Sequence, residues 1–203
     1  MLRLETYLAV GLLALCTSAT AANLVFGDDP FAGTDALTTP GRDIVNGPGD
    51  PFVFDIANDV LTFDLGVFGL SQLSFANGLS TSLPASGVNF IVLNNGAPLA
   101  AGTAANAIAD QISQSGPGFF IYFNTGLDLP RLVYSTDLSD NTADLTILAR
   151  LTNLNGPAGF AALPSITAAN VGEVPEPSSI VLVSAAGAVL LAFRSRRQRQ
   201  SQT

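Results

Sequence analysis

The sequence predicts a mainly β protein, either an antiparallel sandwich or an α+β meander with one short helix. We expect an N-terminal signal peptide and a C-terminal transmembrane helix to flank it. Three observations predict this. Short apolar runs alternate with polar residues and are separated by Gly, Pro, Asn and Asp. Residues 119–136 have the pattern of an aromatic hairpin. Each end of the chain carries a short apolar segment beside arginine.

Residues 1–22 have the three parts of a secretory signal peptide. Arg3 supplies the positive charge, and residues 7–16 form a short apolar stretch. Residues 19–21, Ala-Thr-Ala, form the small-residue cleavage site, so we expect cleavage at or just after its end. Ten apolar residues are too few to span a bilayer as a helix, which favours a cleaved signal over an anchor.

Residues 23–173 form the predicted exported domain. Its first part, up to residue 51, is rich in Gly, Pro and Asp and predicts an edge strand followed by a long surface loop. In the hairpin, Asn124-Thr125-Gly126 is the expected turn, and Pro130 should limit pairing at the start of the second arm. The remaining strands are predicted from apolar and polar alternation. The expected strands are 52–56, 60–65, 87–93, 119–123, 131–136 and 145–152.

One helix is predicted between residues 103 and 112. Its apolar residues Ala104, Ala105, Ile108 and Ile112 recur at helical spacing, with Thr103 as the possible N-cap. The hairpin that follows is rich in aromatic residues. They allow a carbohydrate-binding platform, but aromatic residues on a hairpin more often fill a core. The residues concerned are Phe119, Phe120, Tyr122 and Phe123.

Composition excludes several classes of chemistry. The chain has no His and no Lys, and its single Cys lies within the predicted signal peptide. These absences exclude a Ser-His-Asp triad, a Schiff-base lysine, a P-loop lysine and a His or Cys zinc site. The predicted domain carries three Arg against thirteen Asp and one Glu, so its net charge is 3 − 14 = −11. Such a charge repels phosphate backbones, so we expect no nucleic-acid partner.

Oxygen ligands crowd only in residues 137–144, which we call the acidic turn. Asp137, Asp140 and Asp144 are the candidates for a calcium site, because calcium takes six to eight oxygen ligands. The alternative is that these side chains bond to nearby backbone groups and make turns. Asp28, Asp29 and Asp35 form a second group with the same two interpretations. No other cofactor is expected.

The C-terminal region has three parts in order. Val174-Pro175-Glu176-Pro177-Ser178-Ser179 comes first, and its prolines cannot continue a helix or strand. The apolar run 180–193 follows and is predicted to be a transmembrane helix. The basic tail 194–203 then sets the topology, because basic flanks stay in the cytoplasm. Its arginines are Arg194, Arg196, Arg197 and Arg199.

This region resembles the PEP-CTERM sorting signal of Gram-negative bacteria, also labelled an ice-binding protein C-terminal domain. The resemblance covers Val174 to about Arg199 and rests on the order of its three parts. It implies recognition of Pro175, Glu176 and Pro177 by an exosortase, a membrane enzyme that cleaves near them. An ordinary C-terminal anchor with a proline hinge is the alternative.

Together these observations predict a protein exported across the inner membrane and anchored there until C-terminal processing, then located at the cell surface or outside the cell. Signal peptidase, an exosortase and the membrane are its expected partners. We expect a structural or binding role, linked to the exopolysaccharide matrix that the resemblance implies, and no enzymatic activity. The alternative is an all-Asp carbohydrate-active hydrolase, which would need two carboxyl groups in one cleft.

Overall fold

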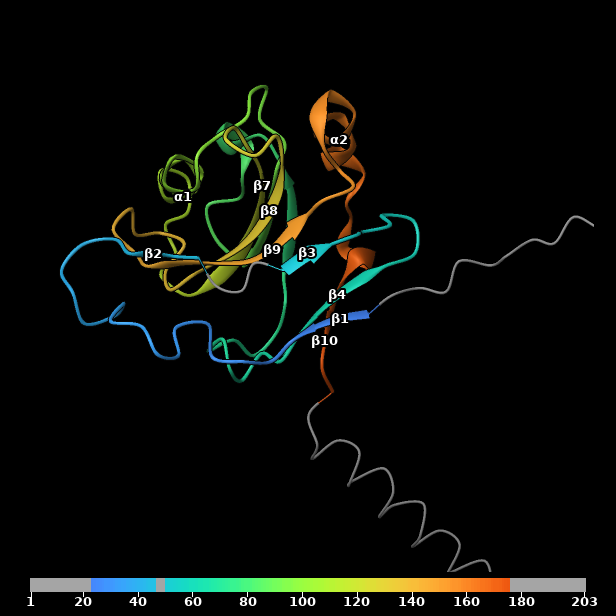
Figure 1. The fold of residues 1–203 in the computed structure, drawn as a ribbon. Coiled ribbons are helices and arrows are strands. Elements are labelled where there is room, and N and C mark those ends of the chain that lie inside the picture. The colour runs from blue at the N-terminus through green and yellow to red at the C-terminus, as the bar shows by residue number, and fades with distance from the viewer. Residues whose placement is uncertain (1–22, 47–49, 176–203) are drawn as a thin grey trace, which may run out of the picture.

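The computed structural model describes residues 23–46 and 50–175 of the 203-residue chain. This part is mainly β, as the sequence predicts, but its strands form mixed sheets and it contains two α-helices (Figure 1). The sequence predicted an antiparallel sandwich or an α+β meander with one short helix; the parallel strand pairs and the second helix differ from that prediction. The predicted signal peptide, the transmembrane run 180–193 and the basic tail lie outside the described residues.

The main sheet contains seven strands in the order β2-β9-β8-β7-β6-β5, with β3 pairing on β9 as well. The pairs β7–β8 and β8–β9 are antiparallel, and the other pairs are parallel. The strands are β2 (Ile44–Val45), β3 (Asp50–Phe52), β5 (Phe75–Gly78), β6 (Phe90–Leu93), β7 (Gly118–Asn124), β8 (Leu129–Ser135) and β9 (Leu145–Leu151).

The aromatic hairpin and the strand after it are confirmed as β7, β8 and β9. Pro130 lies opposite Phe123 within the β7–β8 pair, so it does not shorten that pairing. Pairing of β8 with β9 begins one residue later, at Arg131. Strand β6 is joined to β7 through helix α1 (Ala101–Ala109), and the two strands are parallel. A helix between two strands of one sheet is the usual connection for a parallel pair.

A second, smaller sheet joins the two ends of the domain. We call it the terminal sheet; its order is β1-β4-β10 and both pairs are parallel. Its strands are β1 (Asn23–Phe26), β4 (Val60–Phe63) and β10 (Val171–Glu173). The first and last strands of the described domain therefore meet on either side of β4.

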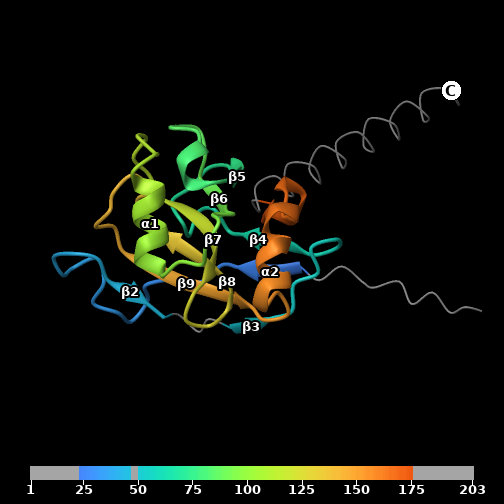
Figure 2. The same ribbon diagram turned by 90° about the horizontal axis from the view of Figure 1, so that it is seen from above.

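The helices cover opposite sides of the main sheet (Figure 2). Helix α1 begins after Ala100, which makes no side-chain cap, so the prediction of Thr103 as N-cap is wrong. Helix α2 (Gly156–Ala162) was not predicted, because its two Gly and one Pro disfavour a helix. The short 3₁₀ turns are η1 (Ser80–Ser82), η2 (Leu163–Ser165) and η3 (Ala168–Asn170).

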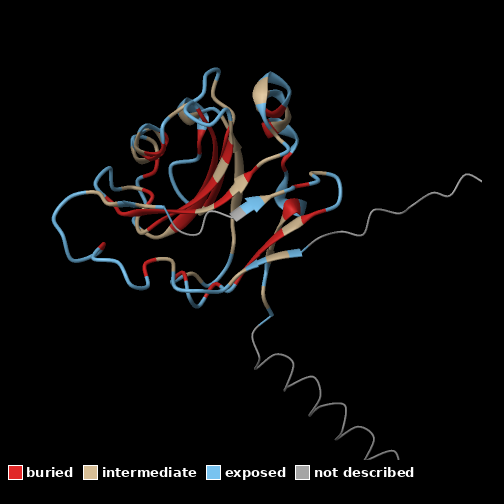
Figure 3. Cartoon of the chain, viewed as in Figure 1, coloured by how far each residue is buried: buried red, intermediate tan, exposed pale blue. Residues whose placement is uncertain are grey.

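The core has two parts, one on each face of the main sheet (Figure 3). Phe119 and Phe123 face the terminal sheet and α2, whereas Phe120 and Tyr122 face α1. All four side chains are at most 3% exposed. They are core residues, so the alternative of a carbohydrate platform on this hairpin is wrong.

The predicted strand 52–56 ends early, at Phe52. The backbone N–H of Phe54 donates to Asn153 Oδ1 at 2.8 Å, and its carbonyl accepts from Asn153 Nδ2 at 3.0 Å. One amide side chain therefore takes the place of a strand partner. Phe54 is still fully buried, which explains why the alternation of apolar and polar residues continued past the end of the strand.

Candidate functional site

Side chains of the terminal sheet pack it against the core, among them the fully buried Leu61 and Phe63 of its central strand. Phe63 is fully buried, and its ring centroid lies 4.2 Å from that of Phe119 in β7. It also stacks on Phe26 of β1 at 5.1 Å. The opposite face carries Val25, which is 55% exposed. The sheet is thus buried on the side of the main sheet and open on the other.

The last described strand, β10, leads directly into the predicted sorting motif. The backbone N–H of Val174 donates to the carbonyl of Phe63 at 2.9 Å, directly after β10. Glu173 Oε1 accepts from the backbone N–H of Leu73 at 2.7 Å. Pro175 has no N–H and cannot extend the ladder. Of the motif, the structure describes Val174 and Pro175, whereas residues 176–179 lie outside the described part.

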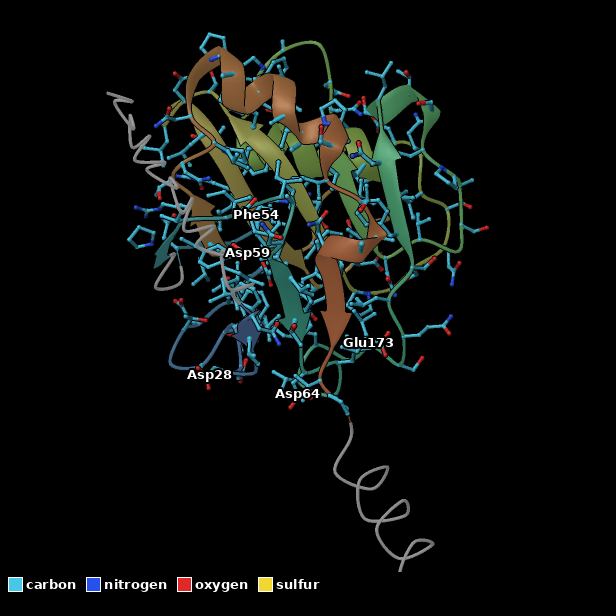
Figure 4. The ribbon with its side chains drawn as sticks, turned by 90° about the vertical axis from the view of Figure 1, so that its right-hand side faces the viewer. Asp28, Phe54, Asp59, Asp64 and Glu173 are labelled. Atoms are coloured by element: carbon cyan, nitrogen blue, oxygen red, sulfur yellow. The ribbon has the colours of Figure 1, made fainter. Side chains whose placement is uncertain are left out.

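The three strands of the terminal sheet are parallel, so their carboxyl ends lie together at one end of the sheet. Asp64 and Glu173 lie at this end (Figure 4). Asp28 follows β1 at the same end. Asp64 Oδ1 accepts from the backbone N–H of Gly66 at 3.2 Å. Within residues 23–46 and 50–175, no group of three His, Cys, Asp or Glu residues is placed to hold a metal ion. The amino ends of β1 and β4 lie at the opposite end of the strands. The predicted signal-peptide cleavage site precedes β1 at that end, whereas the predicted sorting motif follows the carboxyl end of β10.

A groove of about 440 Å³ runs beside β1. Its walls come from β1 and the loop after it, from β2 and β3, and from β9. Phe26, Phe52 and Phe68 give it an aromatic lining, and among the described side chains Asp28 and Asp29 are the charged ones that line it. This volume and this mixed lining are typical of small-ligand sites.

Asp29 is already committed to a turn, since its Oδ1 accepts from the backbone N–H of Phe31 at 3.0 Å. Burial, and second the negative charge of Asp29, raise the pKa of Tyr134 to about 12. The Tyr134 hydroxyl donates to the carbonyl of Phe68 at 3.0 Å. Asp35 does not line the groove; its carbonyl accepts from the backbone N–H of Thr38 at 3.2 Å. Of the second acidic group predicted from the sequence, Asp28 and Asp29 therefore line the groove and Asp35 does not.

In the acidic turn, Asp137 and Asp140 each bond to nearby groups. Asp137 accepts from Ser115, Gly116 and Ser139, and Asp140 Oδ1 accepts from the N–H and hydroxyl of Thr142, both at 2.7 Å. Burial alone would raise the pKa of Asp137, but these hydrogen bonds outweigh it and lower that pKa. Those from Thr142 lower the pKa of Asp140.

Asp144 has a long-range role that its sequence neighbourhood does not reveal. It is 8% exposed, and its two carboxylate oxygens accept from the backbone N–H groups of Asp43 at 2.7 Å and Leu37 at 2.9 Å. It thereby fixes the long N-terminal loop against the start of β9. The three aspartates of the acidic turn do not converge on one point, and calcium binding there stays a prediction.

The four arginines that are predicted to set the membrane topology lie outside the described residues; they are Arg194, Arg196, Arg197 and Arg199. In the part of the chain that is described, no helix has the length and apolar character that a membrane crossing requires. No protein-family model, no curated protein and no solved structure matches the chain.

Proposed function

We propose that this chain is an exported PEP-CTERM protein, anchored in the inner membrane and released or transferred after an exosortase cleaves near Pro175-Glu176-Pro177. The supporting observation is the position of the motif relative to the fold. Strand β10 and the hydrogen bond from Val174 to Phe63 bring ordered pairing to the first residue of the motif. A sorting signal must be accessible, and here its first residue directly follows β10, the last strand of the described residues.

The distance to the membrane follows from the same boundary. Four residues separate Pro175 from Ile180, the first residue of the predicted span. A fully extended chain covers at most about 18 Å over those five steps. In this proposal the motif holds the domain close to the membrane until cleavage.

After export we propose a structural or binding role in the extracellular matrix. The predicted exported domain lacks His, Lys and Cys, so it has no imidazole, amine or thiol group to act as a nucleophile or base. It offers the groove beside β1, with an aromatic lining and a carboxylate rim. Exopolysaccharide is the proposed partner, because aromatic rings pack on the C–H faces of sugars while carboxylates accept from their hydroxyls.

Mass spectrometry of the extracellular protein from an exosortase-containing host tests the proposal. We expect chains that begin near Ala22 and lack the tail from Arg194 onward. Replacing Pro175 and Pro177 by Ala should leave the tail attached, whereas the matched control Pro98→Ala, at an exposed loop position, should be processed normally. Extracellular protein that retains residues 194–203 would contradict the proposal.

The alternative, an all-Asp carbohydrate-active hydrolase, is favoured by one observation, the presence of Asp28 and Asp29 in the groove. The test is release of reducing ends from matrix polysaccharide. A hydrolase should lose this release in both Asp28→Asn and Asp29→Asn and keep it in the control Asp110→Asn, at the C-terminal end of α1. Binding without release of reducing ends supports the binding role instead.

A further inference from the structure

Two of the three arginines of the exported domain lie directly opposite each other. Arg131 in β8 pairs with Arg150 in β9 in the antiparallel register. Directly opposed residues have Cβ atoms about 4.5–5.5 Å apart, and like charges there destabilise a sheet. The arrangement is unexpected in a domain with fourteen acidic residues available to separate or neutralise the pair.

Neither arginine has a partner within residues 23–46 and 50–175. Both Nε atoms are buried without a hydrogen bond, and no hydrogen bond or ion pair of either guanidinium is found among the described residues. Arg42, the third arginine, differs sharply. It donates to the carbonyls of Ala143 and Gly102, both at 3.0 Å, and to Asn106 Oδ1 at 2.7 Å.

The residues directly opposite the pair in the neighbouring strands β7 and β3 carry no negative charge. Tyr122 lies opposite Arg131 in β7, and its hydroxyl accepts from Asn124 Nδ2 at 3.1 Å. Pro51 lies opposite Arg150 in β3 and has no N–H. Both arginines are half-buried and their Nε atoms are buried, so each guanidinium group is partly removed from water.

We propose that Arg131 and Arg150 form a binding site for an oxyanion, that is, a carboxylate, sulfate or phosphate group. Guanidinium groups present planar arrays of donors that match oxyanions, and charge-assisted hydrogen bonds of this kind are about twice as strong as neutral ones. One anion between the two side chains removes their mutual repulsion and supplies the missing acceptors. The site does not depend on the export pathway and lies on strands that do not carry the sorting motif.

The charge of the domain limits which ligands use the site. A net charge of −11 repels anions at long range, so binding depends on short-range pairing. The oxyanion can come from a free inorganic ion or from an acidic sugar such as a uronate. Sulfate and phosphate represent the first source, and oligogalacturonate represents the second, with a neutral maltooligosaccharide as its control.

The test uses the full chain in nonionic detergent. Binding is measured by titration of the arginine Nε–H resonances and by thermal unfolding at constant ionic strength with chloride as the reference ion. We expect sulfate, phosphate or oligogalacturonate to bind with millimolar or tighter affinity and to raise the melting temperature above that in chloride. Arg131→Gln and Arg150→Gln should each weaken binding at least tenfold.

Arg199→Gln is the matched control, because it removes one positive charge from the basic tail. The anion affinity of this variant should stay within twofold of that of the parent chain. Oligogalacturonate binding tenfold tighter than sulfate identifies an acidic sugar as the ligand, whereas equal affinities identify a free inorganic oxyanion. Equal effects of all anions and chloride, or unchanged affinity in Arg131→Gln, would overturn the proposal. So would a tenfold gain in Asp50→Asn, because it would mean that an acid of this chain already neutralises the pair.

Discussion

Replacing Phe63 by Ala should loosen the terminal sheet. The side chain is fully buried, and its ring contacts the aromatic rings of Phe26, Phe119 and two further phenylalanines at centroid distances between 4.2 and 6.1 Å. Removing a buried Phe ring costs about 3–5 kcal/mol through lost transfer energy and the cavity left behind. For a domain of this size, 1 kcal/mol shifts the melting temperature by about 2–4 °C, so we expect a fall of about 10 °C.

Chemical denaturation and amide hydrogen exchange of the full chain measure the effect. Exchange at Val174 should accelerate more than exchange in β8, because the lost ring connects the terminal sheet to the main one. Val25→Ala is the matched control on the exposed face of the same sheet, and it should change stability by less than about 0.5 kcal/mol. A Phe63→Ala loss below about 1.5 kcal/mol, or uniform acceleration of exchange, would refute the reasoning.

Four further predictions concern the rest of the domain. Gly159→Ala should unfold the α2 region, because an added Cβ would lie 2.0 Å from the backbone of Leu154; Gly96→Ala, which meets nothing within 4 Å, should leave the melting temperature within about 2 °C. Burial raises the pKa of Tyr134 to about 12, so the stability that the neutral side chain contributes is complete below pH 10 and is lost between pH 10 and 12. In denaturation measured as a function of pH, Tyr134→Phe should not show this loss. Asp144→Asn should cost about 1.5–3 kcal/mol, measured by urea denaturation, because two backbone N–H groups lose a charged acceptor. Millimolar calcium should raise the melting temperature more than magnesium or ionic-strength-matched sodium if the acidic turn binds it; equal shifts would contradict that prediction.

Helix α1 shows which features of an element its local sequence pattern predicts and which it does not. Its apolar spacing located it to within two or three residues, because Ala104, Ala105 and Ile108 do face the sheet. Its start was placed wrongly, since Ala100 precedes it without a capping side chain. Strand β5 was missed because its four residues, Phe-Ala-Asn-Gly, show no clear alternation and are ordered by pairing with β6.

The candidate sites divide in the same way. The proposed sorting motif is contiguous, so the sequence alone could suggest it by resemblance. The groove beside β1 draws its walls from segments as far apart as Phe26 and Ala149, and no local signal links them. Asp144 was singled out as a calcium ligand, whereas its contacts show a carboxylate that bonds a loop 107 residues away at Leu37. Arg131 and Arg150 carried no signal, because each is a single charge in its own strand.

The sequence by itself determined the β-rich class, the strands of the aromatic hairpin and the exclusion of His-, Lys- and Cys-based chemistry, because alternation and composition are local properties. Only the tertiary structure decided that β1 and β10 flank β4 in parallel and that Arg131 faces Arg150. The physical reason is that alternation specifies which face of a strand is buried but not which strand lies beside it. That choice depends on packing between segments distant in the chain, such as the contact of Phe63 with Phe119.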